Sequence, residues 1–459
     1  MEIGIIGAGV AGLAMAWEAL KQGHRPSVFE QAPFLGGQAS TFLVGNQPLE
    51  RGYHHLFLSD TDILELVDEI GLGDKMKWFE SSVGVLHQGR LYDFVTPLDL
   101  LKFTPVSLPG RIRLGLATLY LQRIKNWQSL EKYRAEEWVR KFVGGSAYAG
   151  FWGPLLRGKF GAYYDQVGMP WLWGKIQTRF ASRKGLGSEK LGYPIGSFGE
   201  IFEELSRQIR ERGGEVHVGV GVEKIVLEGD RAAGFLFRQD HDMPERSFDA
   251  IITTTPSYIL PRLVPSMPDH YVQQLNNVDY LSAVLLILEL DRPLSDIYWL
   301  NVADVDVPFV GIIEHTNLVS PELYGGRHVV YIANYLSRDS YLYGLDQDDL
   351  LDEYAPYLQM VNKSFDRSWI QKVHHHKVDA AQPVIPANFS DKILPHRTPV
   401  RDLYLANTTQ IYPEDRGTNY SVRLGRKVIR MVLDDKGFPT TGELPKPPIP
   451  SSFTVSGGV

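Results

Sequence analysis

Residues 3–12 read IGIIGAGVAG, and this stretch decides the fold. Its β-branched start predicts a short strand, and apolar residues at helical spacing over 13–20 predict a helix that ends at Gly23. Residues 27–29 predict a second strand, which ends at Glu30. Strand, glycine turn, helix and second strand in this order are the fingerprint of a dinucleotide-binding unit.

Each part of this unit has a physical role. Gly7 permits the tight turn, Gly9 lets backbone N–H groups approach a pyrophosphate, and Gly12 lets helix and strand pack closely. Glu30 lies 18 residues beyond Gly12, where an acid accepts hydrogen bonds from a ribose. The alternative is a glycine-rich corner without a ligand. The predicted cofactor contacts of this unit are Gly7, Gly9, Ala11, Gly12, Glu30 and Gln31.

Composition narrows the class of protein. The 459 residues are 44% hydrophobic and 22% charged, which is typical of a globular chain of two or three packed modules. The net charge of −7 argues against a nucleic-acid partner. Since there are no cysteines, disulfides, thiolate metal sites and a cysteine-linked flavin are excluded. No leader and no membrane-spanning run are expected, so a cytoplasmic enzyme is predicted.

A glycine pair extends the fingerprint. Gly36, Gly37 and Gln38 follow Glu30 after five residues, and a Gly pair suits a close backbone approach to a cofactor. Here the chain resembles the flavin amine oxidase, protoporphyrinogen oxidase and carotenoid desaturase superfamily of two-dinucleotide-binding-domain flavoproteins. In that family a basic residue usually follows the pair, where this chain has Gln38. The resemblance implies an FAD cofactor, and the absence of cysteine indicates that it is bound non-covalently.

The resemblance also implies a discontinuous FAD-binding domain, which we place at residues 1–75, 191–260 and 395–435. In the family, the valine matched by Val222 offers backbone contacts to adenine. Near the C-terminus the family usually has Gly-Asp after a strand, where this chain has Asn407 and Thr408. The further cofactor contacts that the resemblance implies in this last segment are Asn407, Thr408, Gly417, Thr418 and Asn419.

Two residues are candidates for the substrate side of the flavin ring. Residues 50–57, ERGYHHLF, resemble the acid–x–Gly–x–His segment of carotenoid desaturases and UDP-galactopyranose mutases, which passes beside the isoalloxazine ring. His54 is therefore one catalytic candidate, although a histidine at a strand edge is more often a satisfied hydrogen-bonding residue. Tyr420, which opens the C-terminal helix, is the other.

Residues 76–190 and 261–394 are predicted to form the substrate domain, the first part helical and basic, the second rich in strands. Residues 101–190 carry a net charge of +11, so the rest of the chain carries −18. Residues 101–125 interleave Arg and Lys with Leu and Tyr, which suits peripheral contact with an anionic membrane and equally an ordinary amphipathic helix. The tail over 436–459 is expected to be flexible.

Basic residues among aromatics suggest where an anionic substrate binds, and the alternative is plain helix packing with exposed charges. The candidates are Arg157, Lys159 and Arg179. Three consecutive histidines, residues 374–376, are interpreted as a solvated strand, because neighbours on a strand point to opposite faces and no third ligand accompanies them. No metal site is predicted.

Together these features predict an α/β fold, with a Rossmann-like FAD-binding domain beside a mixed substrate domain. The expected function is that of an FAD-dependent oxidoreductase of the oxidase or desaturase type. It would move hydride from a C–H bond of a small molecule to flavin N5, and oxygen or a quinone-like acceptor would reoxidise the flavin. Two alternatives stay open: a UDP-galactopyranose-mutase-like flavoenzyme without net redox, and a non-catalytic binding protein on the same fold.

Overall fold

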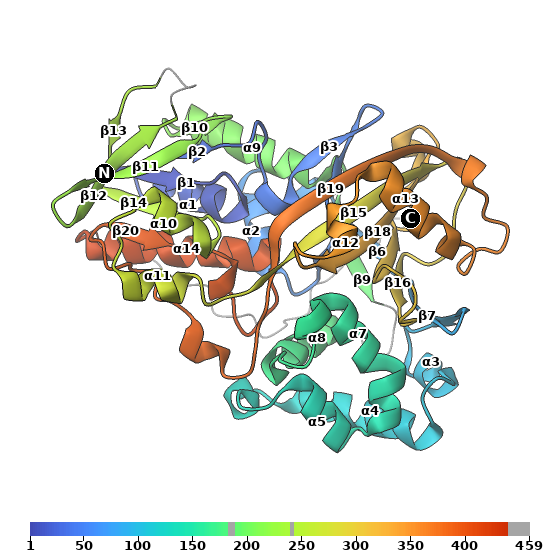
Figure 1. Cartoon of the computed structure of the whole chain (residues 1–459). Coiled ribbons are helices and arrows are strands. Elements are labelled where there is room, and N and C mark those ends of the chain that lie inside the picture. The colour runs from blue at the N-terminus through green and yellow to red at the C-terminus, as the bar shows by residue number, and fades with distance from the viewer. Residues whose placement is uncertain (182–188, 239–242, 439–459) are drawn as a thin grey trace.

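The computed structural model describes residues 1–181, 189–238 and 243–438 (Figure 1). The predicted tail therefore falls outside the described residues from 439 onward. Two sheets lie side by side, and a group of helices lies below them in the view of Figure 1. Every helix within the described ranges is too short or too polar to cross a bilayer.

The first sheet is parallel throughout. Its five strands, in spatial order, are β10 (Glu215–Val218), β2 (Arg25–Glu30), β1 (Glu2–Ile6), β14 (Ala250–Thr253) and β20 (Leu403–Leu405). Because parallel neighbours need crossover connections, the chain leaves this sheet and returns to it. The five strands come from all three segments that the sequence assigns to the FAD-binding domain.

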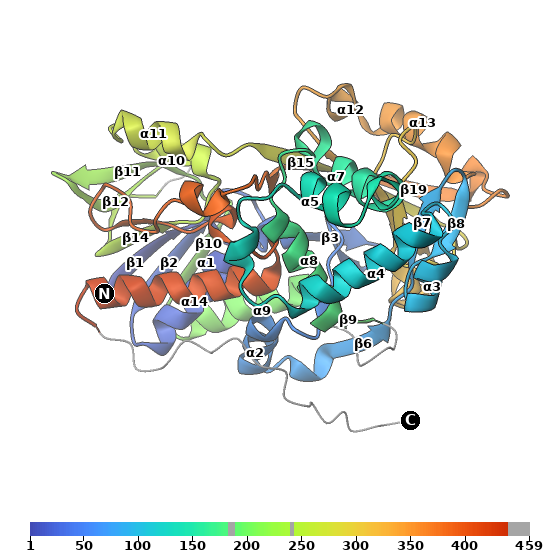
Figure 2. The same cartoon turned by 90° about the horizontal axis from the view of Figure 1, so that it is seen from below.

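Helices cover one face of the parallel sheet, as Figure 2 shows: α1 (Val10–Lys21), α9 (Ser197–Glu211) and α14 (Thr418–Asp435). A Cβ on Gly425 of α14 would lie 2.7 Å from the Ala11 carbonyl oxygen, so α1 and α14 pack with their backbones close together. On the other face lie β11 (Val222–Glu228), β12 (Arg231–Phe237), β13 (Arg246–Ser247), α10 (Leu260–Leu263) and α11 (Asp269–Leu275). Their aromatic and aliphatic side chains form a separate core with Phe29 and Ile251.

The second sheet has seven strands and is antiparallel except for the pair β16 and β7. In spatial order they are β19 (Ile370–Pro383), β15 (Tyr280–Leu290), β18 (His328–Leu336), β17 (Gly311–Glu314), β16 (Trp299–Val302), β7 (Val83–His87) and β8 (Arg90–Asp93). The first five lie in the stretch predicted to be rich in strands. Residues 76–190, expected to be helical, also contribute β7 and β8, and the buried run 83–86 pairs with β16.

The remaining elements join and cover the sheets. The helical group below them consists of α3 (Pro97–Lys102), α4 (Leu108–Arg123), α5 (Ala135–Phe142), α6 (Gly145–Ala147), α7 (Gly153–Phe160) and α8 (Met169–Ala181). A small sheet, β5 (Leu56–Phe57), β9 (Lys190–Pro194) and β6 (Met76–Glu80), links the two regions. The other elements are β3 (Thr41–Val44), β4 (Gln47–Glu50), α2 (Thr61–Glu69), α12 (Tyr341–Gly344) and α13 (Gln347–Leu358).

Candidate cofactor and substrate site

The first glycine loop makes a tight turn between β1 and α1. Gly7 has a φ of +107°, a conformation that favours glycine, and a Cβ on Gly12 would lie 2.0 Å from the Gly7 carbonyl oxygen. Gly9 precedes α1, and no side chain caps the helix, so its first N–H groups lack a side-chain acceptor. This end of the helix therefore has the donors and the positive dipole end that bind a phosphate.

The second glycine pair packs against the first loop. Gly36 and Gly37 have φ values of +94° and +57°, and the Gly36 N–H donates to the Ala8 carbonyl at 2.9 Å. A Cβ on Gly37 would lie 3.1 Å from the Gly9 Cα. The two loops thus pack backbone against backbone, too close for a side chain between them, and this pair of loops is called the glycine cradle here.

The acid at the end of β2 belongs to the same cradle. The Glu30 carboxylate accepts hydrogen bonds from the N–H groups of Ala8 (3.0 Å) and Ala32 (2.9 Å). The Glu30 carbonyl accepts from the Val220 N–H at 2.8 Å, two residues before Val222 and the start of β11. Arg238 donates to the Gln31 side chain at 3.2 Å. Glu30, Gln31 and the Val222 segment, all predicted cofactor contacts, therefore lie side by side.

The N-terminus of α14 supplies a polar side chain with a free donor. Asn419 is 2% exposed, and its side-chain oxygen accepts from the Ile63 N–H at 3.1 Å. Its Nδ2 is buried and has no hydrogen-bond partner within the described part of the chain. A buried donor without an acceptor costs about 1–3 kcal/mol, so Nδ2 is suited to an acceptor on a ligand. Thr418 is buried beside it, and Gly417 precedes the helix.

The structure does not support the prediction that Asn407 contacts a flavin. Its Nδ2 donates to the Thr255 carbonyl (2.9 Å) and the Ser257 hydroxyl (3.1 Å), and its Oδ1 accepts from Thr409. Both polar atoms of this side chain are therefore engaged: Oδ1 caps the turn at Thr408 after β20, and Nδ2 joins that turn to the segment after β14. Asparagine favours such a capping role because its side chain bonds to the backbone two residues on.

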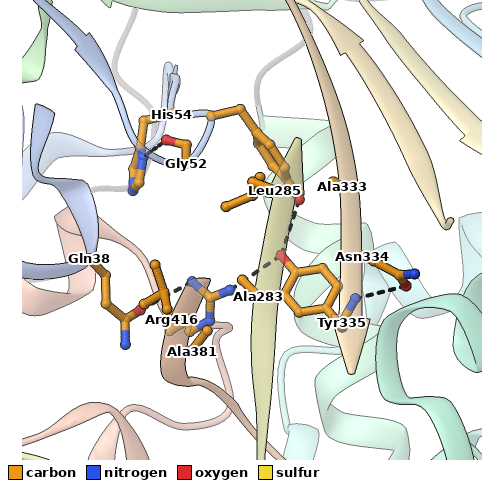
Figure 3. A pocket seen from close by; sticks show the side chains of 12 residues that line it. Gln38, Gly52, His54, Ala283, Leu285, Ala333, Asn334, Tyr335, Ala381 and Arg416 are labelled. Carbon is orange, nitrogen blue, oxygen red and sulfur yellow. Dashed lines mark hydrogen bonds between the residues drawn. The ribbon is translucent and has the colours of Figure 1, made fainter. Parts of the chain in front are cut away.

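A pocket with an open volume of about 450 Å³ lies beside the glycine cradle (Figure 3). Gln38 connects the cradle to the pocket, because it follows the second glycine pair directly and also lines the pocket. Its side chain donates to the Ala380 carbonyl at 3.1 Å. Apolar side chains from β15, β18 and β19 form part of the wall. The lining residues are Gln38, Gly52, Tyr53, His54, Ala283, Leu285, Ala333, Asn334, Tyr335, Val378, Ala381 and Arg416.

Tyr335, on β18, is the centre of a polar cluster at this pocket. Its hydroxyl lies 3.0 Å from the Tyr53 hydroxyl and accepts from Arg416 Nη2 at 3.3 Å. Lys159 Nζ lies 3.9 Å from the centre of the Tyr335 ring. Burial acts to raise the pKa of Tyr335, but the Lys159 and Arg416 cations outweigh it and lower this pKa to about 7.

Two cations of the cluster lack a carboxylate partner. Among the described residues, no carboxylate oxygen lies within 4.0 Å of the Lys159 Nζ or of the Arg416 guanidinium nitrogens, and burial lowers the pKa of Lys159. The nearby Asp415 pairs instead with Lys175 at 2.6 Å. Burial acts to raise the pKa of Asp415, but Lys175, Lys159 and Arg416 together lower it well below its usual range. The pocket therefore carries an excess of positive charge.

The two catalytic candidates occupy different places. His54 lines the pocket, and its Nδ1–H donates to the Gly52 carbonyl at 2.6 Å. Burial lowers the pKa of His54 to about 4, so the imidazole is neutral at pH 7 and its Nε2 is an acceptor. Tyr420 is not among the lining residues; it lies in the first turn of α14, with the Arg423 guanidinium 5.3 Å from its ring centre.

Glu50 anchors the segment that carries Gly52 and His54. It is fully buried at the end of β4, where its carboxyl accepts from the Phe198 N–H (2.7 Å) and the Tyr193 hydroxyl (2.8 Å). Its carbonyl accepts from the Tyr331 hydroxyl at 2.7 Å. Burial raises the pKa of Glu50 to about 7 despite these hydrogen bonds. The carboxyl thus connects the pocket segment to the start of α9.

None of the three basic residues expected to bind substrate lines the pocket, but Lys159 packs on the ring of Tyr335, which does. Arg157 lies over the Tyr164 ring at 5.7 Å, and Arg179 pairs with the buried Glu189 at 3.3 Å. Tyr53, Tyr335 and Arg416 were not predicted as site residues. Tyr53 lies within the quoted ERGYHHLF stretch and Arg416 directly precedes Gly417, so both stand next to residues that were predicted to be in the site. Nothing in the sequence around Tyr335 marks it as a site residue.

The expectation that the three histidines of β19 are solvated is wrong for His374 and His376, which pack on Phe42 and lie beside charged groups. His374 Nε2 lies 2.7 Å from the Glu289 carboxylate, and His376 Nδ1 lies 3.2 Å from Arg51 Nη1. The rings of His374 and His376 both lie within 5 Å of the Phe42 ring centre. Across the described residues, no three His, Asp or Glu side chains are grouped to hold a metal ion.

A parallel sheet with a glycine cradle at its edge, beside a pocket walled by a second sheet, defines a flavoprotein-type α/β architecture. The family model for flavin-containing amine oxidoreductases matches residues 10–413. The chain belongs to this family, and it is therefore a flavin-dependent oxidoreductase. The predicted superfamily, the α/β fold and the oxidoreductase class are confirmed.

The individual relatives share little sequence identity with this chain. The 15-cis-phytoene desaturase of Synechococcus elongatus is 22% identical over 332 residues, which cover 65% of this chain and 67% of that protein. The coproporphyrinogen III oxidase of Propionibacterium freudenreichii is 25% identical over 182 residues, 36% of this chain and 33% of that protein. Reduced UDP-galactopyranose mutase superposes with a TM-score of 0.74 at 16% identity, over 97% of this chain and 98% of that one.

The described residues fit the flavin that the family implies. The glycine cradle leaves backbone bare where a Cβ on Gly37 would close it, and Asn419 Nδ2 is a buried donor that lacks an acceptor. Both features lie at ends of helices that pack on each other, α1 and α14. A dinucleotide with a pyrophosphate at α1 would meet both the donors and the positive end of that helix.

Proposed function

We propose that the protein binds FAD non-covalently and transfers hydride from a C–H bond of a small anionic substrate to flavin N5. Oxygen or a quinone-like molecule then reoxidises the flavin. The observation that carries the substrate class is a pair of cations whose side chains have no carboxylate partner in the described structure: Arg416, which lines the pocket, and Lys159, which lies over the ring of the pocket residue Tyr335. A substrate carboxylate or phosphate would compensate their charge.

The protein's own residues position the reactants. The glycine cradle and Glu30 hold the ADP half of the cofactor, and Asn419 Nδ2 donates to it near the other end. When bound, FAD supplies the hydride acceptor, because no side chain can perform that step. The absence of cysteine supports non-covalent binding.

Within the pocket, Arg416 and Lys159 bind the anionic group and thereby fix the orientation of the substrate. The Tyr53 and Tyr335 hydroxyls stabilise that arrangement through their mutual hydrogen bond. The neutral His54 accepts a hydrogen bond, or a proton released from a substrate N–H or O–H group, at Nε2. The apolar wall of Ala283, Leu285 and Ala333 excludes water from the reacting carbon.

The cofactor assignment is tested by the absorption spectrum of the purified protein and chromatography of the flavin released on denaturation. Release of FAD in near-stoichiometric amount is the expected result. A colourless protein that cannot be reconstituted with FAD would overturn the proposal. Flavin that stays attached to the denatured chain would overturn the non-covalent part alone.

The substrate class is tested by anaerobic bleaching of the flavin with amines, porphyrinogens and polyenes, each compared in a carboxylated and a neutral form. The names of the relatives motivate the last two classes. We expect bleaching by a carboxylated compound, and Arg416→Gln or Lys159→Met to raise its KM about 100-fold. The matched control is Lys427→Met, which removes an exposed cation outside the pocket. An unchanged KM in both pocket variants would contradict the role of the cations.

The positive pocket also favours a second candidate, a mutase of nucleotide-diphosphate sugars that uses reduced flavin without net redox. The fold shared with UDP-galactopyranose mutase is compatible with it. Isomerisation of a UDP-sugar by the dithionite-reduced protein, with no bleaching by any substrate, would replace the redox proposal. Membership in an oxidoreductase family stands against the third alternative, a non-catalytic binding protein.

A further inference from the structure

The outer face of α4 exposes large apolar side chains along its whole length. Residues four apart on a helix share a face, and this face is 44–61% exposed at Leu108, Ile112, Leu116, Leu119 and Tyr120. The opposite face of α4 is buried at Leu114 and Leu121, against the helices that include α8. An ordinary amphipathic helix would carry polar side chains on its outer face, so packing within this chain does not explain the sequence of α4.

The exposed surface continues onto α3. Leu98 and Leu101 are 57% and 49% exposed, and Arg111 ties the two helices together by donating to the Val106 and Leu101 carbonyls. We call these seven apolar side chains of α3 and α4 the α3–α4 face. Scattered apolar residues on a surface are ordinary, but a contiguous patch of this size marks an interaction site.

The charge around the α3–α4 face is of one sign. Between Asp99 and Glu131 the chain has five basic residues and no acidic one: Lys102, Arg111, Arg113, Arg123 and Lys125. Within the described part of the chain, none of the five forms an ion pair within 4.0 Å. Outside residues 101–190 the chain carries −18, so a negatively charged surface would attract this side of the protein and repel the rest.

We propose that the α3–α4 face docks on the surface of an anionic phospholipid bilayer. Apolar side chains enter the headgroup and acyl boundary, while the cations meet lipid phosphates. α4 has 16 residues and is about 24 Å long, so it lies along the surface and does not span it. A protein partner with an acidic rim would need a shape complementary to the face, whereas a bilayer requires only this combination of exposed apolar and basic side chains. The proposal does not depend on the reaction proposed above.

Sedimentation of the flavin-loaded protein with vesicles tests the proposal. One set of vesicles is phosphatidylcholine alone and the other contains about 30% phosphatidylglycerol, each at low and high salt. We expect binding to the anionic vesicles only, weakened by salt. Ile112→Glu with Leu116→Glu should reduce the partition coefficient at least about tenfold. Arg113→Gln with Lys125→Gln should reduce it about 25-fold at low salt and little at high salt.

A matched control is Leu43→Glu with Val305→Glu, which changes two side chains of similar or greater exposure outside the α3–α4 face. This variant should bind anionic vesicles as the unchanged protein does. Wild-type protein that stays in the supernatant with anionic vesicles would overturn the proposal, as would equal binding by Ile112→Glu/Leu116→Glu. If the protein is a dimer in the absence of vesicles and Ile112→Glu/Leu116→Glu makes it a monomer, the α3–α4 face would be assigned to a second copy of the chain instead. Flavin content and bleaching, measured on the same samples, report separately on the proposed reaction.

Discussion

The glycine cradle and the pocket beside it are built from different parts of the polypeptide. The cradle is made of backbone, and two short stretches of sequence, residues 7–12 and 36–37, determine nearly all of its shape. The pocket is made of side chains as far apart in sequence as Tyr53, Leu285, Tyr335 and Arg416, and Lys159 packs behind Tyr335. A backbone site allows few substitutions, because a Cβ on Gly7, Gly12 or Gly36 would lie less than 3 Å from another atom, whereas a side-chain site can change its charge or length while the fold persists.

This difference explains how one architecture can serve unrelated substrates. The cradle binds a part of the cofactor that is the same for every reaction, so its geometry is fixed. The pocket determines what is oxidised, and its wall consists of strands that tolerate exchange of side chains. Substitutions should therefore have different effects in the two regions. In the cradle they should abolish folding or flavin binding, and in the pocket they should change the kinetics while flavin is retained.

The largest effect is expected for Gly12→Val. Its Cβ would lie 2.0 Å from the Gly7 carbonyl oxygen, which is backbone and cannot move aside. We expect a loss of at least about 4 kcal/mol in the free energy of unfolding, or no folded protein, by thermal or urea unfolding. Gly9→Ala is the matched comparison, because its Cβ would meet only the Gly37 Cα at 3.8 Å.

Gly9→Ala should fold with a stability within about 1 kcal/mol of the unchanged protein, since Gly9 has a φ of −73° that alanine adopts. Its methyl group, however, would stand inside the glycine cradle, so FAD affinity should fall about 100-fold in reconstitution titrations. A Gly9→Ala protein purified with full flavin would show that the cradle is wider than its backbone geometry indicates.

Glu50 tests the connection between the two regions through the pH dependence of stability. Its pKa is about 7 in the folded protein and near 4.5 in the unfolded chain, so the folded state holds an extra proton between these values. The contribution to stability is complete below about pH 4.5 and is lost as the pH rises to 7, by about 3 kcal/mol. In Glu50→Gln the decrease in stability between pH 5 and pH 8, measured by urea unfolding, should be smaller by about this amount, since the buried carboxyls of Asp60 and Glu314 still contribute to it. An identical decrease in both proteins would show that the carboxyl is ionised in the fold.

Tyr335→Phe should alter kinetics and leave flavin content unchanged. The pKa of Tyr335 is about 7, so its phenolate forms above this pH and offsets one of the pocket cations. The KM for an anionic substrate should therefore rise up to about tenfold between pH 6 and pH 9, and Tyr335→Phe should remove the rise. In Tyr53→Phe, which loses the hydrogen bond to Tyr335, the rise should move to higher pH. A KM that is flat with pH in the unchanged protein would argue against this cluster as the anion site.

The smallest effect concerns His54. Because its pKa is about 4, its protonation should not influence kcat/KM between pH 6 and pH 8. His54→Gln, which retains an acceptor and a donor, should lower kcat by about tenfold or less and leave the pH dependence of kcat/KM between pH 6 and pH 8 unchanged. An inflection of kcat/KM near pH 6.5 that disappears in His54→Gln would show that His54 titrates in this pH range.

The sequence predicts the cradle well and the pocket poorly, for a physical reason. Gly7, Gly9, Gly12 and Glu30 act through local backbone geometry, which a short motif encodes completely. Tyr335 and Arg416 become neighbours only because β18 and the loop before α14 meet in the folded chain. Their sequence separation carries no period or spacing that a single chain displays.

Elsewhere the sequence misled for equally local reasons. β7 and β8 were not predicted, because they lie in a stretch dominated by helices and a four-residue buried run does not distinguish a strand from part of a helix. Asn407 was expected to face the cofactor because of its place after a buried strand. Its side chain instead bonds to the adjoining turn and to Thr255 and Ser257, a contact that only the folded chain shows.

The order of strands in the parallel sheet has a consequence for synthesis of the chain. β1 is made well before the sheet can be completed, since β20 pairs with β14 and α14 packs on α1 only some 400 residues later. During translation the edge of β14 and the apolar side of α1 stay uncovered until β20 and α14 leave the ribosome. Newly made chains should therefore depend on chaperones until α14 emerges, and premature termination before it should yield aggregation-prone protein.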